Sequence, residues 1–224
     1  MNAPDPLQTS FAEDLPDPTQ SVDLLAQAQN GDQQALSALL DRYQARLHRI
    51  VRVRLGARLR TRVESMDIVQ DAYAVAMRKI GDLEVRGPGS ILNWLARIAE
   101  HKIHDANDYF GAEKRDLGRE KALDASGSAS GAFGLRDRFA ASADAPDEEA
   151  SRSELREIID DALTELSDVH REVILLRDYC GGDWDYVART LGRGNTHAAQ
   201  ELHRRAWIKL RRAVRPRLGD RSPD

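Results

Sequence analysis

The sequence contains little cysteine, few aromatic residues and no long apolar run. Its 224 residues include a single cysteine, Cys180, and only 5% aromatic residues. One cysteine excludes an intrachain disulfide and a zinc site built from several cysteines. No apolar run approaches the roughly 20 residues that span a bilayer. The N-terminus also lacks the basic and then apolar regions of a secretion signal, so we expect a cytoplasmic protein without membrane insertion.

Motifs of catalysis are missing as well. The chain has no Gly-rich phosphate loop, nucleophile elbow or paired-carboxylate motif. His101 and His104 are three residues apart on an expected helix, but no third metal ligand follows at a clear spacing. Cys180 falls on an apolar helix stripe, where a small buried side chain is expected. The sequence therefore predicts no enzymatic activity, no cofactor and no metal site.

Charge is distributed unevenly along the chain, although the formal net charge is only −4. Residues 1–41 carry −7, residues 42–122 carry +6, residues 123–168 carry −8 and residues 169–219 carry +6. Two basic segments separated by an acidic one suggest two nucleic-acid-facing modules on an acidic tether.

The pattern near the C-terminus predicts three successive helices. Ser167 is placed to cap the first, and Gly181-Gly182 ends it, because glycine accepts the left-handed conformation of a helix stop. Asp183 is placed to cap a short second helix. Residues 192–195 form a turn, and a third helix starts at about Thr196. A short helix, a Gly-containing turn and a longer helix predict a helix-turn-helix.

The third helix has two different sides. Its apolar side would bury Ala199, Leu202, Ala206 and Leu210, and its other side is polar and partly basic. Cations continue from Arg204 to Arg217, as expected for contact with a phosphate backbone. A plain helical hairpin with surface arginines is the alternative interpretation.

The N-terminal half is expected to be helical from Val22, after a disordered tail at residues 1–20. Asn30-Gly31 ends the first helix and Asp32 caps the second, whose C-terminal half is rich in arginine. Ser65 is expected to cap the next helix, and another begins at Ser90. On the Ser65 helix, a polar stripe faces away from the apolar side: Asp67, Gln70, Asp71, Ala74 and Arg78. Taken alone, that stripe would be a solvated face.

Residues 118–151 are rich in Gly, Ala, Ser and Asp, which predicts a flexible acidic linker. The expected fold is all-α. It consists of two helical modules at residues 21–117 and 152–218, with a tail at residues 219–224.

Three stretches match the motifs of a known family. MDIVQDAYAVAMRKI (66–80) resembles a core-polymerase-binding helix, and NWLARIA (93–99) resembles a W-L-x-x-I-A segment. LTELSDVHREVILLRDYCGGDWDYVARTLG (163–192) is similar to the start of a promoter-reading module. Over residues 22–117 and 152–215, the chain resembles bacterial RNA polymerase sigma factors of the sigma-70 superfamily, of the extracytoplasmic-function (ECF) type.

The resemblance implies a function and partners. The N-terminal module would be sigma region 2, and the C-terminal module would be the sigma region 4 helix-turn-helix. The protein would bind core RNA polymerase at the largest-subunit clamp helices and the flap, and would direct promoter-specific initiation. An anti-sigma protein is a further expected partner. A related hypothesis is that this partner, or contact between the two modules, holds the free protein inactive.

The resemblance also assigns site residues. Polymerase docking falls to Asp67, Gln70, Asp71 and Arg78. Capture and melting of the −10 element fall to the loop at residues 84–90 and the helix after it, with Arg86, His101, Lys102, Tyr109, Lys114 and Arg115 as candidates. The −35 element would be read by Arg193, Thr196, His197, Gln200, Glu201, Arg204, Arg205, Arg211 and Arg212.

Two departures from the family pattern leave alternatives open. Glu201 stands where a basic residue is common, and ANDYF (106–110) replaces an Arg-rich run. One alternative is a stand-alone helix-turn-helix regulator, which gives the Asp67 stripe no task. The other is a sigma-like interaction protein without promoter recognition.

Overall fold

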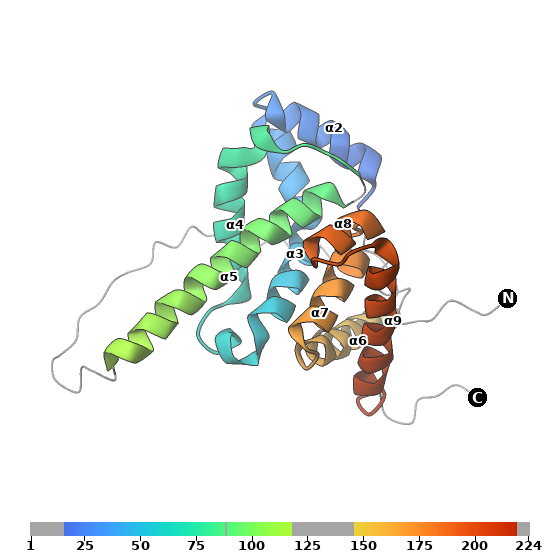
Figure 1. The fold of residues 1–224 in the computed structure, drawn as a ribbon. Helices are drawn as coiled ribbons and strands as arrows, with labels where there is room; N and C mark the ends of the chain where they lie inside the picture. The colour runs from blue at the N-terminus through green and yellow to red at the C-terminus, as the bar shows by residue number, and fades with distance from the viewer. Residues whose placement is uncertain (1–15, 88, 118–145, 219–224) are drawn as a thin grey trace.

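The computed structural model describes residues 16–87, 89–117 and 146–218, and the ordered elements in these ranges are helices. The N-terminal group comprises α2 (Pro18–Gln29), α3 (Gln33–Arg60), α4 (Ser65–Lys79) and α5 (Ser90–Leu117). The C-terminal group comprises α6 (Pro146–Thr164), α7 (Asp168–Ile174), α8 (Trp184–Thr190) and α9 (Thr196–Val214). The all-α, two-module fold expected from the sequence is confirmed (Figure 1).

The N-terminal module is built around α3. Leu47, Ile50 and Val51 are fully buried on this helix, which packs against α2, α4 and α5. Asp32 caps α3 by accepting hydrogen bonds from the backbone N–H groups of Gln34 and Ala35, at 2.8 and 3.1 Å, as the sequence predicted. Near its end α3 kinks at Gly56, where φ is +63°, a value that glycine accepts without strain.

The C-terminal module surrounds α7 and the π-helical turn that extends it, η2 (Leu175–Tyr179). Val173, Ile174 and Leu175 are fully buried, and α9 packs across α6, α7 and α8. Gly181, with φ of +68°, ends this helical run as expected. In Figure 1, α4 and α9 lie on opposite sides of the molecule, with α3 and α5 between them.

The structure corrects several expected boundaries. α2 begins at Pro18, because proline suits the first turn of a helix and the Asp17 carboxylate caps it; residues 18–20 are therefore not a disordered tail. α6 begins at Pro146, so residues 146–151 are helical rather than linker. Ser65 is not the cap of α4; its hydroxyl lies 2.7 Å from the Nε2 atom of His48. Residues 1–15, 118–145 and 219–224 of the predicted tails and linker lie outside the described residues.

Candidate nucleic-acid interface

The turn between α8 and α9 is fixed by local hydrogen bonds. The Asp183 carboxylate accepts from the N–H of Tyr186 at 2.7 Å and caps α8, as expected. The Asn195 side chain accepts from the N–H of Ala198 at 2.8 Å and caps α9. Between them, Gly192 adopts φ of +60°. These contacts set the angle between the two helices, as a helix-turn-helix requires.

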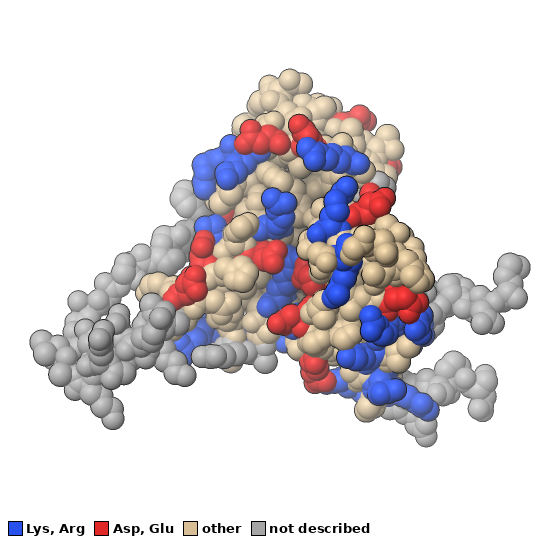
Figure 2. Space-filling view, in the orientation of Figure 1, with Lys and Arg blue, Asp and Glu red and all other residues tan. Residues whose placement is uncertain are grey.

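The outer face of α9 is open to solvent. Ala199, Ala206 and Leu210 are fully buried on the inner face, so the predicted amphipathic pattern is confirmed. Most of the predicted −35 candidates are exposed: Arg193, His197, Gln200, Arg204, Arg205, Arg211 and Arg212. Thr196 and Glu201 are half-buried. Figure 2 shows Lys and Arg side chains gathered over the lower part of α9. The predicted residues therefore share one surface.

Glu201 neutralises part of this surface. Its carboxylate accepts hydrogen bonds from Arg204 at 3.0 Å (Nη2) and at 3.2 Å (Nε). The hydrogen bond from Arg204 lowers the pKa of Glu201 below its ordinary value. The pair holds the Arg204 guanidinium in one orientation and offsets its charge.

A partly buried acceptor, Asp178, anchors α9 to the rest of its module. The Asp178 carboxylate lies 2.7 Å from Nε2 of His203 and accepts the indole N–H of Trp207 at 3.0 Å. His203 and Trp207 are one turn apart on α9. The local sequence around Asp178 does not indicate this role, because its partners lie on a helix more than 20 residues away. The pairing of His203 and Trp207 at i,i+4 was the signal available.

The polar stripe on α4 forms a second exposed surface. Asp67, Gln70, Asp71 and Arg78 are exposed, while Ile68, Val69, Ala72 and Ala76 are buried on the opposite side. Met77 is 50% exposed and precedes Arg78 on the same helix. The arrangement expected from helical spacing is confirmed, and an exposed methionine beside acidic residues is a feature of protein-binding surfaces.

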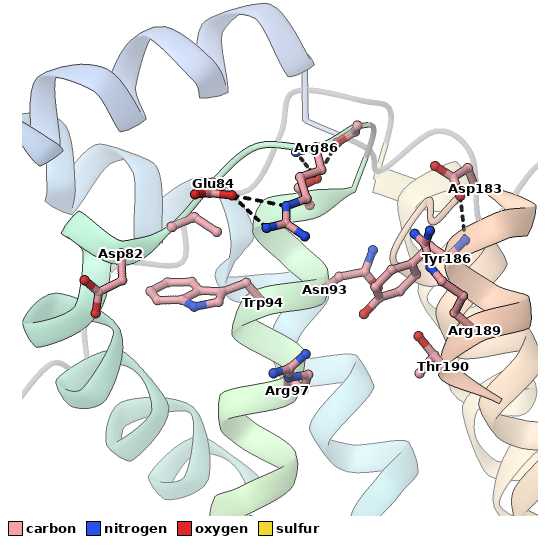
Figure 3. Close-up of a pocket in the computed structure, with 13 residues that line it drawn as sticks. Asp82, Glu84, Arg86, Asn93, Trp94, Arg97, Asp183, Tyr186, Arg189 and Thr190 are labelled. Carbon is pink, nitrogen blue, oxygen red and sulfur yellow. Dashed lines mark hydrogen bonds and ion pairs between the residues drawn. The ribbon is translucent and has the colours of Figure 1, made fainter. Parts of the chain in front are cut away.

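The loop before α5 borders a cavity of about 900 Å³ (Figure 3). One wall comes from residues 82–97 and the other from α8, including Tyr186, Arg189 and Thr190. The predicted −10 residue Arg86 lines this cavity, where it forms an ion pair with Glu84 at 2.8 Å. The Ser90 hydroxyl accepts from the N–H of Arg86 at 3.1 Å, which holds the loop against the start of α5.

The other −10 candidates are spread along α5. Tyr109 is 68% exposed and makes an edge contact with Phe110, with ring centroids 5.3 Å apart. His101 is exposed, and Lys102 pairs with Asp105 at 3.2 Å. At about 1.5 Å per residue, Tyr109 lies nearly 30 Å from the start of the helix. The structure therefore does not bring these candidates together with Arg86. The side chains of Lys114 and Arg115 lie outside the described residues.

The described ranges contain no group of three or more His, Cys, Asp or Glu side chains arranged to hold a metal ion. Cys180 is fully buried, and burial raises the pKa of its thiol to about 12. Among the described helices, none combines the length and apolar character needed to cross a bilayer.

Within the described residues, the capped α8–α9 pair with its basic outer face has the geometry of a helix-turn-helix. The family model for ECF sigma factors matches residues 18–213, and the chain belongs to this family. A curated relative, the ECF RNA polymerase sigma-E factor of Haemophilus influenzae, is 30% identical over 170 residues, covering 75% of this chain and 82% of the relative. The protein is thus a sigma factor, which directs transcription initiation.

The fold also matches a solved structure, that of CnrH in complex with the cytosolic domain of CnrY. This match covers 88% of the present chain and 98% of the other, with a TM-score of 0.50 and 22% sequence identity. It supports the shared helical architecture.

Proposed function

We propose that the protein docks on core RNA polymerase through the outer face of α4 and reads the −35 promoter element with α9. The observation that carries the proposal is the placement of these two surfaces. The α4 face and the α9 face are both exposed, and the two helices lie on opposite sides of the molecule (Figure 1). One surface can therefore hold the polymerase while the other contacts DNA.

The α4 face suits a protein partner. Asp67, Gln70 and Asp71 supply a carboxylate–amide–carboxylate group on a rigid helix, and the half-exposed Met77 supplies apolar contact. Oxygens in this array accept hydrogen bonds from arginine and lysine side chains of a partner helix. We assign this face to the clamp helices of the largest polymerase subunit, and the C-terminal module to the neighbourhood of the flap.

The α9 face suits a major groove. His197, Gln200 and Arg204 lie one turn apart along the exposed side and can reach base edges. Arg205, Arg211 and Arg212 flank them and are placed for phosphate contacts. A helix capped at its N-terminus and anchored through Asp178 gives these side chains a fixed register.

The −10 element is assigned to the N-terminal module. Arg86 and Trp94 border the cavity beside the loop, which offers a cation and an aromatic surface for an unpaired base. Tyr109 and His101, exposed farther along α5 and away from the cavity, are assigned to separate contacts with the same promoter element. We also propose an anti-sigma protein, which the resemblance implies, as a binding partner.

The test is binding of the purified full chain to core RNA polymerase. We expect Asp67→Ala/Gln70→Ala/Asp71→Ala to weaken binding about 100-fold or more, because hot-spot side chains dominate interface energies. A matched control, Asp23→Ala/Gln27→Ala/Asp41→Ala, removes the same residue types from exposed positions on α2 and α3.

The control is expected to bind as the wild type does. Equal affinity of both triple variants would contradict the docking assignment. Binding to promoter DNA without any binding to polymerase would instead support a stand-alone regulator.

A further inference from the structure

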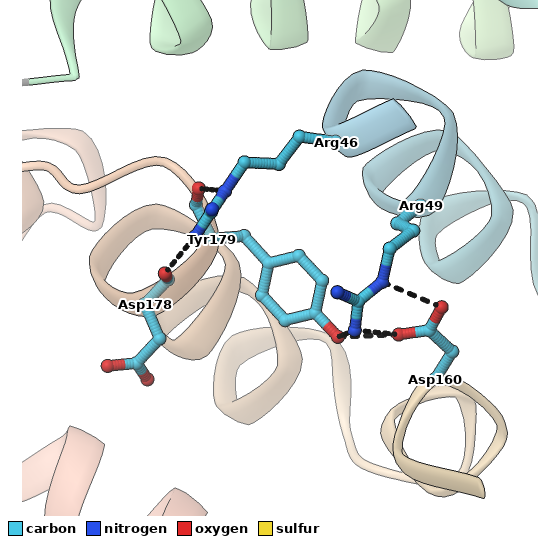
Figure 4. A network of polar contacts seen from close by, with 5 residues as sticks. All are labelled: Arg46, Arg49, Asp160, Asp178 and Tyr179. Carbon is cyan, nitrogen blue, oxygen red and sulfur yellow. Dashed lines mark hydrogen bonds and ion pairs between the residues drawn. The ribbon is translucent and has the colours of Figure 1, made fainter. Parts of the chain in front are cut away.

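Direct contacts between the two modules hold the walls of the 900 Å³ cavity in place. Arg46 of α3 donates to the backbone carbonyl of Asp178 at 3.0 Å, and Arg49 donates to the buried Asp160 carboxylate at 3.1 Å (Figure 4). The sequence interpretation of the first basic segment as nucleic-acid-facing is corrected for these two arginines, because their partners lie within the chain. The cavity that lies between the modules is therefore preformed, as most small-molecule sites are.

Two glycines allow the walls of the cavity to approach each other closely. Gly89, just before α5, has φ of +76°, and a Cβ placed there would lie 1.9 Å from the Cys180 carbonyl oxygen. A Cβ on Gly182 would lie 2.9 Å from a backbone carbonyl oxygen, 3.0 Å from the Tyr186 ring and 3.4 Å from Nδ2 of Asn93. The absence of these two side chains brings Asn93 of α5 close to Tyr186 of α8.

Asn93 is the buried polar residue of the cavity wall. It is only 6% exposed, and in Figure 3 its side chain extends toward Tyr186 on the opposite wall. Its side-chain oxygen has no hydrogen-bond partner among the described residues. Buried polar groups are normally paired, so this amide has bonding capacity that the described fold does not use. An asparagine amide presents a donor and an acceptor, and a half-turn exchanges them, so it can bond to either kind of ligand atom.

Two arginines reach the cavity from opposite walls. Arg97 belongs to α5 and Arg189 to α8, and both are exposed. Neither makes an ion pair or a hydrogen bond with another described residue. Burial raises the pKa of the Tyr186 phenol, and the nearby Arg97 guanidinium offsets part of that rise, so Arg97 lies close to the α8 wall. Two guanidiniums without carboxylate partners can together bind an anion.

The acidic side chains at the cavity leave this anion site a positive charge. Glu84 pairs with Arg86 at 2.8 Å, so these two charges offset each other. Asp183 lies at the α8 wall, where its carboxylate caps the helix by accepting the N–H of Tyr186 at 2.7 Å. Asp82 is exposed and lies at the opposite end of the view from α8 (Figure 3). The end of the cavity with the two unpaired arginines and Asp183 therefore carries a net charge of +1.

The size and the aromatic lining of the cavity suit a ligand with a planar ring. A volume of about 900 Å³ lies within the range of roughly 300–1,000 Å³ that is typical of small-molecule sites. Trp94 of α5 and Tyr186 of α8 are half-buried and line the cavity. Aromatic side chains stack on the faces of nucleic-acid bases of any sequence. A ligand that carries both a base and an anionic group would use the aromatic rings and the two arginines together.

We propose that the cavity binds a free nucleoside monophosphate, with its phosphate between Arg97 and Arg189, its base against the aromatic rings and a hydroxyl or amino group on the Asn93 amide. Guanidinium and phosphate groups form charge-assisted hydrogen bonds, which are stronger than neutral ones. Binding of this ligand requires neither polymerase nor promoter DNA, so it stands apart from the proposed function. An unpaired nucleotide of a DNA strand carries the same chemistry, and the experiments distinguish the two sources.

The first experiment titrates the purified full chain, free of nucleic acid, by isothermal calorimetry. The probes are AMP, GMP, CMP and UMP, with the four nucleosides and inorganic phosphate as partial ligands. At least one monophosphate should bind about tenfold or more tightly than its nucleoside and than inorganic phosphate, because base and phosphate both contribute. A short single-stranded oligonucleotide is the comparison. Binding of the oligonucleotide without binding of any monophosphate would overturn the proposal, as would monophosphates that bind no better than inorganic phosphate.

The second experiment repeats the titration with variants of the two unpaired arginines. Arg97→Ala and Arg189→Ala should each weaken binding of the monophosphate about tenfold, through loss of a charged hydrogen bond to phosphate. Both residues are exposed, so truncation leaves the core intact, and circular dichroism checks that the helices remain. Arg189→Lys should lose less affinity than Arg189→Ala, since it keeps the charge. Arg215→Ala, at an exposed position after α9, is the control and should bind as the wild type does. Unchanged affinity in both alanine variants of the cavity would overturn the proposal.

The third experiment locates the bound nucleotide by NMR spectroscopy of the full chain. The chain has three tryptophans, and each indole N–H gives its own signal, which single Trp→Phe variants assign. The signal of Trp94, which lines the cavity, should shift on addition of the monophosphate, whereas that of Trp207, buried on α9, should not. Backbone signals of Gly87 and Thr190, on the two walls, should shift as well. Shifts confined to the basic face of α9 would place the nucleotide on the DNA-binding helix and overturn the proposal.

Discussion

Two helices of this protein are rich in arginine, and their arginines have opposite environments. On α3, Arg46 and Arg49 are directed into the other module, where they meet carbonyls and a buried carboxylate. On α9, Arg205 and Arg212 are exposed. The same residue type thus joins the chain to itself in one place and remains available to DNA in the other.

The comparison shows that a basic segment does not by itself identify a DNA-binding surface. Both segments carry the same net charge of +6. They differ in the acidic partners of their arginines: α6 brings Asp160 and Asp161 to Arg49 and Arg60 of α3, whereas Arg204 of α9 pairs with Glu201 of its own helix. The position of the acidic partners therefore decides which basic helix can bind phosphate.

The largest expected effect concerns the buried contact between the modules, and in particular the thiol of Cys180. Cys180 lies near Arg46 and Arg54 of α3, and burial raises the pKa of its thiol to about 12, so about 10⁻⁴ of it is thiolate at pH 8. We expect a thiol reagent to label the native protein about 1,000-fold more slowly than the urea-unfolded chain. Because the folded state favours the neutral thiol, this contribution to stability should be lost as pH rises from about 9 towards 12. Rapid labelling of native protein at pH 8 would contradict the buried environment.

A second prediction concerns the exposed helix. Arg205→Ala/Arg211→Ala/Arg212→Ala should weaken binding to a −35 duplex about 100-fold and reduce the slope of log affinity against log salt by about three, through lost phosphate contacts. Fluorescence anisotropy over a salt series measures both. Arg49→Gln, taken from the other basic helix, serves as control and should leave this affinity unchanged. An equal loss of −35 duplex affinity in Arg49→Gln would contradict the assignment of DNA binding to α9 rather than α3.

Removing the Asp178 carboxylate, which anchors α9, should lower the free energy of unfolding by a moderate amount. Asp178→Ala removes the acceptor shared by His203 and Trp207, and we expect the free energy of unfolding to fall by about 1–3 kcal/mol. Urea denaturation followed by tryptophan fluorescence measures the change. Asp185→Ala, at an exposed position on α8, is the control. An unchanged denaturation midpoint for Asp178→Ala would show that the contact does not hold α9.

The smallest expected effect concerns Glu201. Glu201→Gln removes the charge that offsets Arg204, so −35 duplex affinity should rise about two- to fivefold, within the range of exposed ion pairs. As a control, Gln20→Glu adds one negative charge at an exposed position on α2. Any change in its affinity for the −35 duplex measures the general effect of net charge. Reduced affinity of Glu201→Gln would show instead that the carboxylate itself orients Arg204 for recognition.

Helical periodicity predicted the parts of the site that depend on one helix. The exposed stripe of Asp67, Gln70 and Asp71 and the buried side of α9 both follow from a 3.6-residue repeat. The Asp32 and Asp183 caps follow from local side-chain chemistry. These features depend on neighbours within four residues, so the sequence contains the information directly.

Features that depend on distant partners could not be predicted in this way. Arg49 and Asp160 are 111 positions apart, and Arg46 and Tyr179 are 133 apart. Nothing in the local pattern of α3 distinguishes an arginine that meets a carboxylate from one that meets solvent. The π-helical turn η2 was also not predicted, because a regular 3.6-residue periodicity predicts a continuous α-helix over these residues.

The most direct test of the account is sequencing of fragmented genomic DNA captured by the protein together with core RNA polymerase, with and without the Asp67→Ala/Gln70→Ala/Asp71→Ala changes. The account predicts that wild-type protein enriches sites with two conserved blocks at −35 and −10, and that transcripts start just downstream of them. The triple variant should lose this enrichment. Equal enrichment by the triple variant, or by wild-type protein without polymerase, would contradict the proposed division between the α4 and α9 surfaces.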